Sequence, residues 1–150
     1  MSTSVAAYIT TQDCNGAIEF YKKAFNAVEN SARILDDTNR IGHTTIEIGE
    51  TTIHINDEHP ELDILGPIAI GNSPVRFILQ VDDVDQVFRQ ALDAGAEELM
   101  PVEDQFYGER SGRLRDPSGH IWIISTTTED LSNDELAART GDEYHVEETG

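Results

Sequence analysis

Polar side chains that can bind a ligand recur at alternate positions on several segments with strand periodicity. Successive side chains of a strand point to opposite faces, so residues two apart share a face. Imidazole, carboxylate, amide and guanidinium groups on a sheet face can hold the polar part of a small molecule. These groups are His43 and Glu47 of segment 41–48, His54 of segment 51–56, and Arg76 and Gln80 of segment 75–81.

The sequence has no pattern typical of covalent or nucleotide-dependent catalysis. No Ser or Cys lies in a nucleophile elbow or beside an obvious base, and phosphate-binding and dinucleotide fingerprints are absent. Cys14 is the single cysteine and lies among small polar residues at a predicted helix start, so we expect an unreactive thiol. One cysteine fits a reducing compartment. Without a membrane-length apolar run or a signal-peptide pattern, we expect a cytoplasmic protein.

Two halves of the chain repeat the same order of elements. The first half is predicted to contain a strand at 5–11, an amphipathic helix at 15–25, and strands at 28–36, 41–48 and 51–56. After a linker rich in Pro, Gly, Asp and Asn, the second half contains a strand at 75–81, a helix at 84–94, a strand at 97–102 and a final hairpin. The halves align at an offset near 70, with Tyr8 on Ile78 and Asp13 on Asp83. This alignment predicts an internal duplication.

The stretch DQFYGERSGRLRDPSGHIW at 104–122 closes the second half. It has predicted turns at Gly108 and at Ser111-Gly112. Its Asp-Pro-Ser-Gly run at 116–119 has Pro at the second and Gly at the fourth position of a β-turn. The flanking segments 113–115 and 120–126 are predicted strands, and together they make a hairpin.

This hairpin, with Arg-Leu-Arg before the turn and His120 after it, resembles the last hairpin of the vicinal oxygen chelate superfamily. That superfamily contains glyoxalase I, bleomycin- and fosfomycin-resistance proteins and extradiol dioxygenases. The run 104–112 is similar to small glyoxalase-like proteins within it. The segments Tyr8–Asp13 and Ala17–Tyr21 extend the resemblance, which covers about residues 5–130.

The resemblance implies the glyoxalase/bleomycin resistance fold, which is of the α+β class. In this fold two pseudo-symmetric βαβββ modules form an open barrel-like sheet around a cavity, with helices on the convex side. We expect one such domain at 1–130, with modules at about 5–57 and 75–126 and a linker at 58–74. A short helix and an acidic tail should occupy 131–150, since Ser132 begins a capping-box pattern.

Strand alternation then predicts which side chains face the cavity. Arg76, Ile78 and Gln80 should face it, while Phe77 and Leu79 lie under a helix. The same parity places Ala6, Tyr8 and Thr10 on the cavity side and Trp122 on the helix side. No catalytic residue is assigned. The expected ligand-binding residues are Tyr8, His43, Glu47, His54, Arg76, Gln80, Tyr107 and Arg113.

The resemblance also implies where a metal would bind. Metal-dependent members hold a divalent ion with four side chains, usually His and Glu, from the first and last strand of each repeat. Ala and Ile have no ligand atom and Arg is a permanent cation, so we expect neither a metal nor a cofactor. The four positions fall on Ala6, Arg76, Ile123 and His54, with Asn56 as the alternative to His54.

Two interpretations of the histidines remain. A displaced metal site can be drawn from His43, Glu47 and His54, but structural and catalytic zinc want three or four convergent ligands. The favoured interpretation is that His43 and His54 are hydrogen-bonded residues of a polar cavity wall. Of the other three histidines, His120 follows the turn and is expected to be structural.

The arginines near the cavity also have two interpretations. A guanidinium at Arg76 suits a carboxylate or phosphate group, or it forms an internal ion pair with Glu47 or Glu103. Tyr107, Arg110 and Arg113 lie near the Gly108 loop. They either orient a ligand or hold the loop against Asp104 and Glu109.

The formal net charge of −19 restricts the partners. It argues against nucleic acid and against anionic membranes. The charge either steers a cationic ligand or merely solvates the surface, and its concentration in the tail and on helix faces favours solvation. Open sheet edges, which relatives cover by pairing or swapping modules, predict a homodimer.

Two functions follow from these features. The first is a small-molecule binder of the sequestration or resistance type, without the usual metal site. The alternative is a metal-dependent lyase, isomerase or dioxygenase-like enzyme of the same superfamily. Whether a reaction is catalysed stays undecided at the level of sequence.

Overall fold

The computed structural model describes residues 2–149. Met1 and Gly150, which fall in the predicted domain and tail, lie outside the described residues. The first half contains β1 (Tyr8–Thr11), α1 (Cys14–Phe25), β2 (Val28–Glu29), β3 (Ile34–Leu35), β4 (Ile41–Ile48) and β5 (Thr51–Asp57), followed by the short helices η1 (Pro60–Leu62) and α2 (Pro67–Ile70). The second half contains β6 (Arg76–Gln80), α3 (Val84–Asp93), β7 (Glu97–Asp104), β8 (Glu109–Arg115), β9 (Ile121–Thr127) and the tail helix α4 (Asn133–Arg139).

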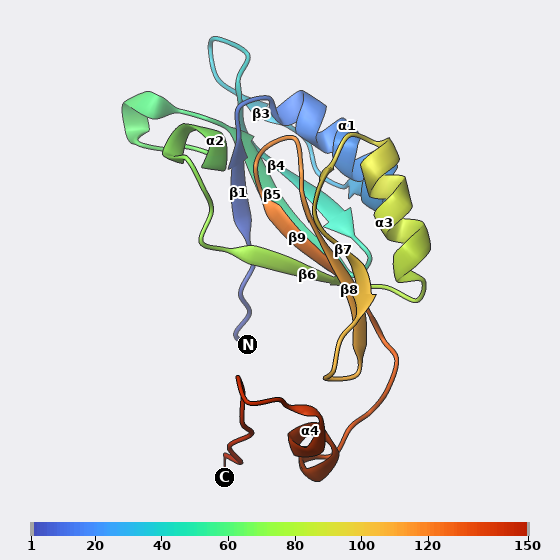
Figure 1. Ribbon diagram of the computed structural model, residues 1–150. Coiled ribbons are helices and arrows are strands. Elements are labelled where there is room, and N and C mark those ends of the chain that lie inside the picture. Colours follow the sequence, from blue (N-terminus) through green and yellow to red (C-terminus); the bar gives the residue numbers. More distant parts are fainter. Residues whose placement is uncertain (1, 150) are drawn as a thin grey trace.

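Each half of the chain forms its own sheet (Figure 1). The first sheet has the strand order β1-β5-β4-β2, with β3 also paired to β4, and the second has the order β6-β9-β8-β7. The strand β1 is parallel to β5, and β6 is parallel to β9. The two sheets do not close into a barrel, so the predicted α+β fold of two βαβββ modules is present in an open form.

The internal duplication is confirmed by the register of the strands. Tyr8 pairs with His54 in the first sheet, and Ile78 pairs with Ile123 in the second. Both helices also begin in the same way. The side chain of Asp13 accepts a hydrogen bond from the backbone amide of Gly16, the third residue of α1. The side chain of Asp83 accepts one from the backbone amide of Gln86, the third residue of α3. These are N-caps, which satisfy amides that have no partner within the helix.

One predicted turn is wrong. Ser111 and Gly112 lie inside β8, where they pair with Ser125 and Ile124 of β9. The turn between β7 and β8 is at Gly108 alone, whose φ of 87° favours glycine. Gly112 has another role, because a Cβ there would lie 2.7 Å from Cε2 of Phe88. This glycine lets α3 approach the sheet closely. Gly112 is therefore required by the packing of Phe88 and not by a turn.

The predicted strand at 28–36 is also interrupted. Thr45 of β4 donates its backbone amide to the side-chain hydroxyl of Ser31, at 3.1 Å. A side chain therefore replaces a backbone carbonyl in the ladder, and the strand divides into β2 and β3. The linker likewise contains η1 and α2, where Pro60 and Pro67 occupy first-turn positions that need no backbone donor.

The helices α1 and α3 lie side by side on one side of the sheets (Figure 1). Their apolar faces meet in one core that both modules share. Trp122 of β9 is 2% exposed, and its ring centroid lies 4.9 Å from those of both Phe25 and Phe77. This confirms that Trp122 belongs to the helix side. None of the helices within residues 2–149 has the length and apolar character needed to cross a membrane.

A buried carboxylate joins the two modules behind this core. Asp116 is 3% exposed and accepts hydrogen bonds from the backbone amides of Ser118 and His120 and from the indole of Trp122, at 2.9–3.0 Å. The hydroxyl of Tyr21 in α1 also donates to it. Burial of the phenol beside this carboxylate raises the pKa of Tyr21 well above its usual value.

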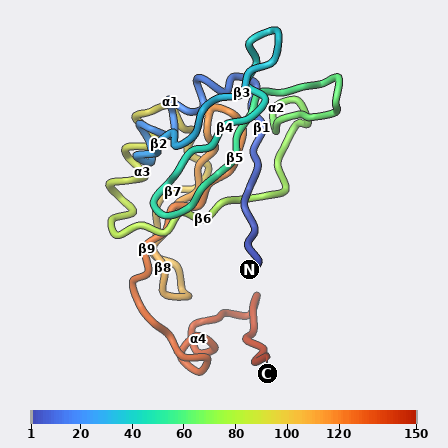
Figure 2. Tube along the Cα trace, turned by 180° about the vertical axis from the view of Figure 1, so that it is seen from behind, coloured from blue at the N-terminus to red at the C-terminus, as the bar shows by residue number. Residues whose placement is uncertain are grey.

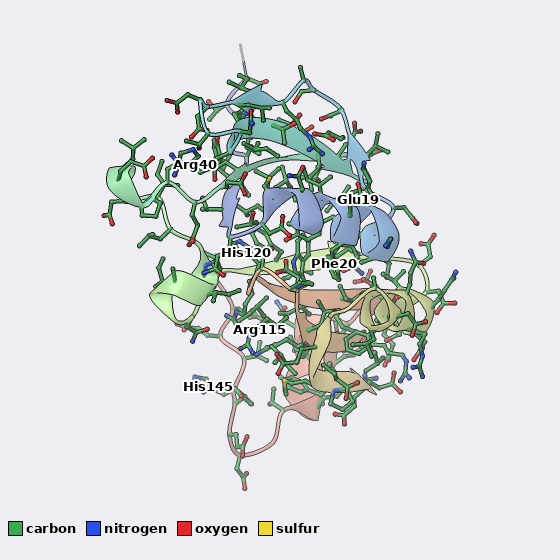
Figure 3. All side chains as sticks on the ribbon, turned by 90° about the horizontal axis from the view of Figure 1, so that it is seen from above. Glu19, Phe20, Arg40, Arg115, His120 and His145 are labelled. Atoms are coloured by element: carbon green, nitrogen blue, oxygen red, sulfur yellow. The ribbon has the colours of Figure 1, made fainter. Side chains whose placement is uncertain are left out.

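His120 makes a second link between the modules. Its Nε2 lies 3.0 Å from the carbonyl oxygen of Thr10, which can only accept, so Nε2 carries the proton. Figure 3 shows His120 where the two modules meet. The expected structural role of His120 is therefore confirmed. The tail helix α4 lies at the predicted residues, apart from both sheets (Figures 1 and 2).

We expect Asp116→Ala to destabilise the protein by about 3–5 kcal/mol, because it leaves the buried Tyr21 hydroxyl and Trp122 indole without an acceptor. Urea unfolding followed by tryptophan fluorescence measures this change. Asp37→Ala is the matched control, since Asp37 is exposed, and it should stay within about 0.5 kcal/mol of the wild type. Equal stabilities of the two variants would contradict the role given to Asp116.

Candidate functional site

The predicted ligand-binding residues fall into two groups on different sheets. The first group lies on the face of the first sheet that points away from the helices. The second lies on the corresponding face of the second sheet and on its β7–β8 turn. The first group is Tyr8, His43, Glu47 and His54, and the second is Arg76, Gln80, Tyr107 and Arg113.

The aromatic rings of three members of the first group, Tyr8, His43 and His54, lie against one another. His43 Nε2 and His54 Nδ1 are 2.8 Å apart, and the Tyr8 ring stacks on His54 with centroids 5.6 Å apart. The Tyr8 hydroxyl donates to the carbonyl of Gly42 at 2.8 Å. One imidazole must donate to the other, so the expected hydrogen bonding of the two histidines is present, although neither lines the cavities described below. Tyr8 is 52% exposed, so part of its ring faces solvent.

Glu47 does not join the histidine pair. Its Oε2 accepts from the side-chain amide of Asn30 at 3.3 Å, and Asn30 in turn accepts from the hydroxyl of Thr45. The carboxylate is thereby held towards β2, at the far end of β4 from His43. Glu47 is on the predicted face, but its contacts explain its position without a ligand.

The second group contains a free guanidinium. Arg76 is exposed, and its side chain forms no hydrogen bond or ion pair with another residue of 2–149, so the expected ion pair with Glu47 or Glu103 is not formed. Its neighbour on the same face, Ile78, is 69% exposed. Gln80 donates to the hydroxyl of Thr127 at 2.8 Å. Arg76 is thus a cation with open donors beside an apolar surface.

Tyr107 and Arg113 line a separate hollow of about 130 Å³ between β7 and β8, together with Glu103 and Ile123. The turn beside it is held by Arg110, which contacts Asp85 at 3.0 Å and Asp104 at 3.3 Å. The hydrogen bond to Asp85, with a smaller contribution from the hydrogen bond to Asp104, raises the pKa of Arg110 above its usual value. Arg110 therefore holds the β7–β8 turn in place. Arg113 lines the small hollow and is not one of the residues that hold the turn.

The positions at which the resemblance places a metal do not fit one. The register pairs Tyr8 with His54 and Ile78 with Ile123, so His54 and Ile123 are equivalent positions of the two modules. Ala6 and Ile123 offer no ligand atom, Arg76 is a cation, and only His54 remains.

The displaced site has equally poor geometry. The two imidazole nitrogens that would bind the ion are hydrogen-bonded to each other, and Glu47 is bonded to Asn30. Within residues 2–149, no group of three or more His, Cys, Asp and Glu side chains is arranged to hold a metal ion.

A larger cavity of about 390 Å³ opens at the carboxyl ends of β1 and β5. Strand alternation in the sequence predicted that Thr10 faces this side. Asn56 was predicted only as the alternative to His54 at a metal position. The loop residues were missed, because the linker has no periodicity from which their direction can be inferred. The loop is closed on itself by paired backbone bonds between His59 and Ile64, at 2.9 and 3.1 Å. The lining residues are Tyr8, Thr10, Gly42, Asn56, His59, Leu62 and Ile64.

The only thiol is not a nucleophile. Cys14 is fully buried at the start of α1, and burial, followed by the charge of Asp57, raises its pKa to about 12. Since the thiolate is the reactive form, the thiol is inert at neutral pH. The expectation from sequence is confirmed.

A family model of the Glyoxalase/Bleomycin resistance protein/Dioxygenase superfamily matches residues 4–124. The chain belongs to this superfamily, whose members share the paired βαβββ modules described above. An uncharacterized protein of Mycobacterium bovis is 34% identical over 138 residues, covering 90% of each chain. An uncharacterized protein of Mycobacterium tuberculosis is also 34% identical over 138 residues, covering 90% of this chain and 81% of that one.

Solved structures confirm the fold. TioX from Micromonospora sp. ML1 superposes with a TM-score of 0.63 at 21% identity, covering 87% of this chain and all of that one. The fosfomycin resistance protein FosX from Mesorhizobium loti gives 0.64 at 16% identity, covering 91% and 99%. A glyoxalase/bleomycin resistance protein/dioxygenase family enzyme from Burkholderia phytofirmans gives 0.62 at 19% identity, covering 81% and 96%.

Proposed function

We propose that the protein binds a small molecule on the open sheet faces, as a sequestration- or resistance-type member of its superfamily that works without the usual metal. The observation behind this proposal is the donor set. Of the four side chains at the metal positions, only His54 has a ligand atom, and it is hydrogen-bonded to His43. The names of the fosfomycin resistance proteins among the similar structures support a resistance role.

Arg76 is the proposed anchor for an anionic or strongly accepting group of the ligand. It occupies a metal position with a fixed positive charge and has no protein partner within the described chain. The overall charge of −19 instead favours encounter with cations. Local charge governs how a ligand is held, while the long-range field mainly affects how often it arrives.

Replacing Arg76 by Met keeps most of the side-chain volume and removes the charge. A panel of metabolites and antibiotics that includes the phosphonate fosfomycin should contain compounds that raise the melting temperature of the wild type. Their affinity should fall about tenfold to a hundredfold in Arg76→Met, as expected for a hydrogen-bonded charge. Arg89→Met is the matched control, since Arg89 is exposed on α3, and it should bind as the wild type does. Equal stabilisation of all three proteins would refute the role of Arg76.

We also propose a homodimer, because the sheet faces opposite the helices are open in one chain. Ile78 and Met100 are 69% and 53% exposed there, and β1 and β6 are sheet edges. A second copy would cover these apolar side chains and edges. Sedimentation equilibrium at micromolar concentration should give twice the 16.6 kDa of one chain. A mass of one chain would count against the dimer.

A metal-dependent enzyme is the second candidate, favoured by the two imidazoles in contact on the open face of the first sheet. In that case His43 and His54 would have to separate and turn towards an ion. Elemental analysis of protein purified without a tag decides between the candidates. We expect less than about 0.1 Zn, Ni, Mn or Fe per chain. A stoichiometric metal that is lost in His54→Ala would establish the enzyme alternative instead.

A further inference from the structure

We infer that the cavity at the carboxyl ends of β1 and β5 is a binding site for an uncharged, flat group that carries a hydrogen-bond acceptor. This inference goes beyond the proposed function and does not depend on Arg76, which lies on the other sheet. It rests on the walls of the cavity, on one amide that has a donor to spare, and on the pairing of the charges around it.

The walls suit a flat apolar group. The Tyr8 ring, 52% exposed, stacks on His54 on one side, while Leu62, 67% exposed, and Ile64 come from the loop. Gly42 forms part of the wall, and its carbonyl accepts the hydrogen bond of the Tyr8 hydroxyl. A volume of about 390 Å³ is within the range of small-molecule sites.

The amide of Asn56 supplies the polar contact. Asn56 is 4% exposed, and its Oδ1 accepts a hydrogen bond from the Thr10 hydroxyl at 2.8 Å. No residue in the described chain accepts from its Nδ2. Every fully buried side-chain nitrogen and oxygen within residues 2–149 has a partner, so Nδ2 must reach solvent, which here is the cavity. A held amide with a free N–H is a preformed donor for a carbonyl or ring nitrogen.

Two carboxylates next to the lining residues in the chain, Asp57 and Glu58, are already engaged by the protein. Asp57 accepts from the backbone amides of Cys14 and Ile41 at 2.8 and 2.7 Å, and Glu58 accepts from that of Gly66 at 2.7 Å. His59 donates its Nδ1 proton to the carbonyl of Asp57 at 2.8 Å. A cation would find these acceptors already occupied.

The guanidinium of Arg40, which reaches the loop that carries Leu62, is also committed. Arg40 binds Asp36 at 2.8 Å and Glu61 at 2.6 Å, and Figure 3 shows it on the side of the linker loop. An anion would have to displace these carboxylates and would meet the strongly negative field of the chain. Neutral ligands avoid both costs.

Three probes of the same shape test the inference: benzamide, benzoate and benzamidine, which are neutral, anionic and cationic. Each is titrated to about 10 mM into ¹⁵N-labelled full-length protein, and the side-chain amide signals of Asn56 are followed by NMR. Benzamide should shift these signals in a saturable manner, and the two charged probes should bind at least tenfold more weakly. Equal or tighter binding of benzoate or benzamidine would overturn the neutral class, and no shift with any probe would overturn the site.

Two variants locate the binding. Leu62→Ala removes an exposed wall residue without touching the core and should weaken benzamide several-fold, while Ile70→Ala, at an exposed position outside the cavity, should not. Asn56→Leu removes the donor and should weaken benzamide about tenfold. Unchanged affinity in both Leu62→Ala and Asn56→Leu would refute the site. Arg76→Met should bind benzamide as the wild type does, so this test and that of Arg76 can fail independently.

Discussion

The buried carboxylate of Asp116 is the constraint on which the arrangement of the two modules depends. It lies at the last turn of the second module, yet it accepts from Tyr21 of the first module's helix as well as from Trp122 and two amides of its own turn. A buried carboxylate is tolerated only when its oxygens are hydrogen-bonded. The Asp-Pro-Ser-Gly turn and α1 must therefore stay together, and His120 adds a bond to β1.

This connection determines which faces of the sheets remain open. Because Tyr21, Phe25 and Trp122 gather on the helix side, both modules bury the same side of their sheets in one core. The opposite faces keep exposed tyrosine, isoleucine and methionine side chains beside polar groups. Those faces are not used in packing the two modules together.

The side chains at the metal positions implied by the resemblance are unsuited to chelation. An arginine and two aliphatic residues stand where a chelating site would need oxygen or nitrogen ligands, and the remaining His54 is engaged by His43. The side chains that remain available are donors: the guanidinium of Arg76 and the amide of Asn56. Both suit recognition of an acceptor on a ligand, and neither is a nucleophile.

The sequence by itself determined most of the elements, the duplication and the faces of the strands. The periods of strand and helix and the caps at Asp13 and Asp83 are local properties, and they were readable without the structure. Local reasoning failed at Gly112, whose missing side chain makes room for Phe88, and at Ser31, whose hydroxyl takes a place in the ladder.

Only the tertiary structure decided which side chains meet. It showed that His43 bonds to His54, that the Arg76 side chain has no partner within residues 2–149, and that the linker forms one wall of a cavity with Asn56. These contacts join residues that are distant in the chain, and no spacing rule relates such residues.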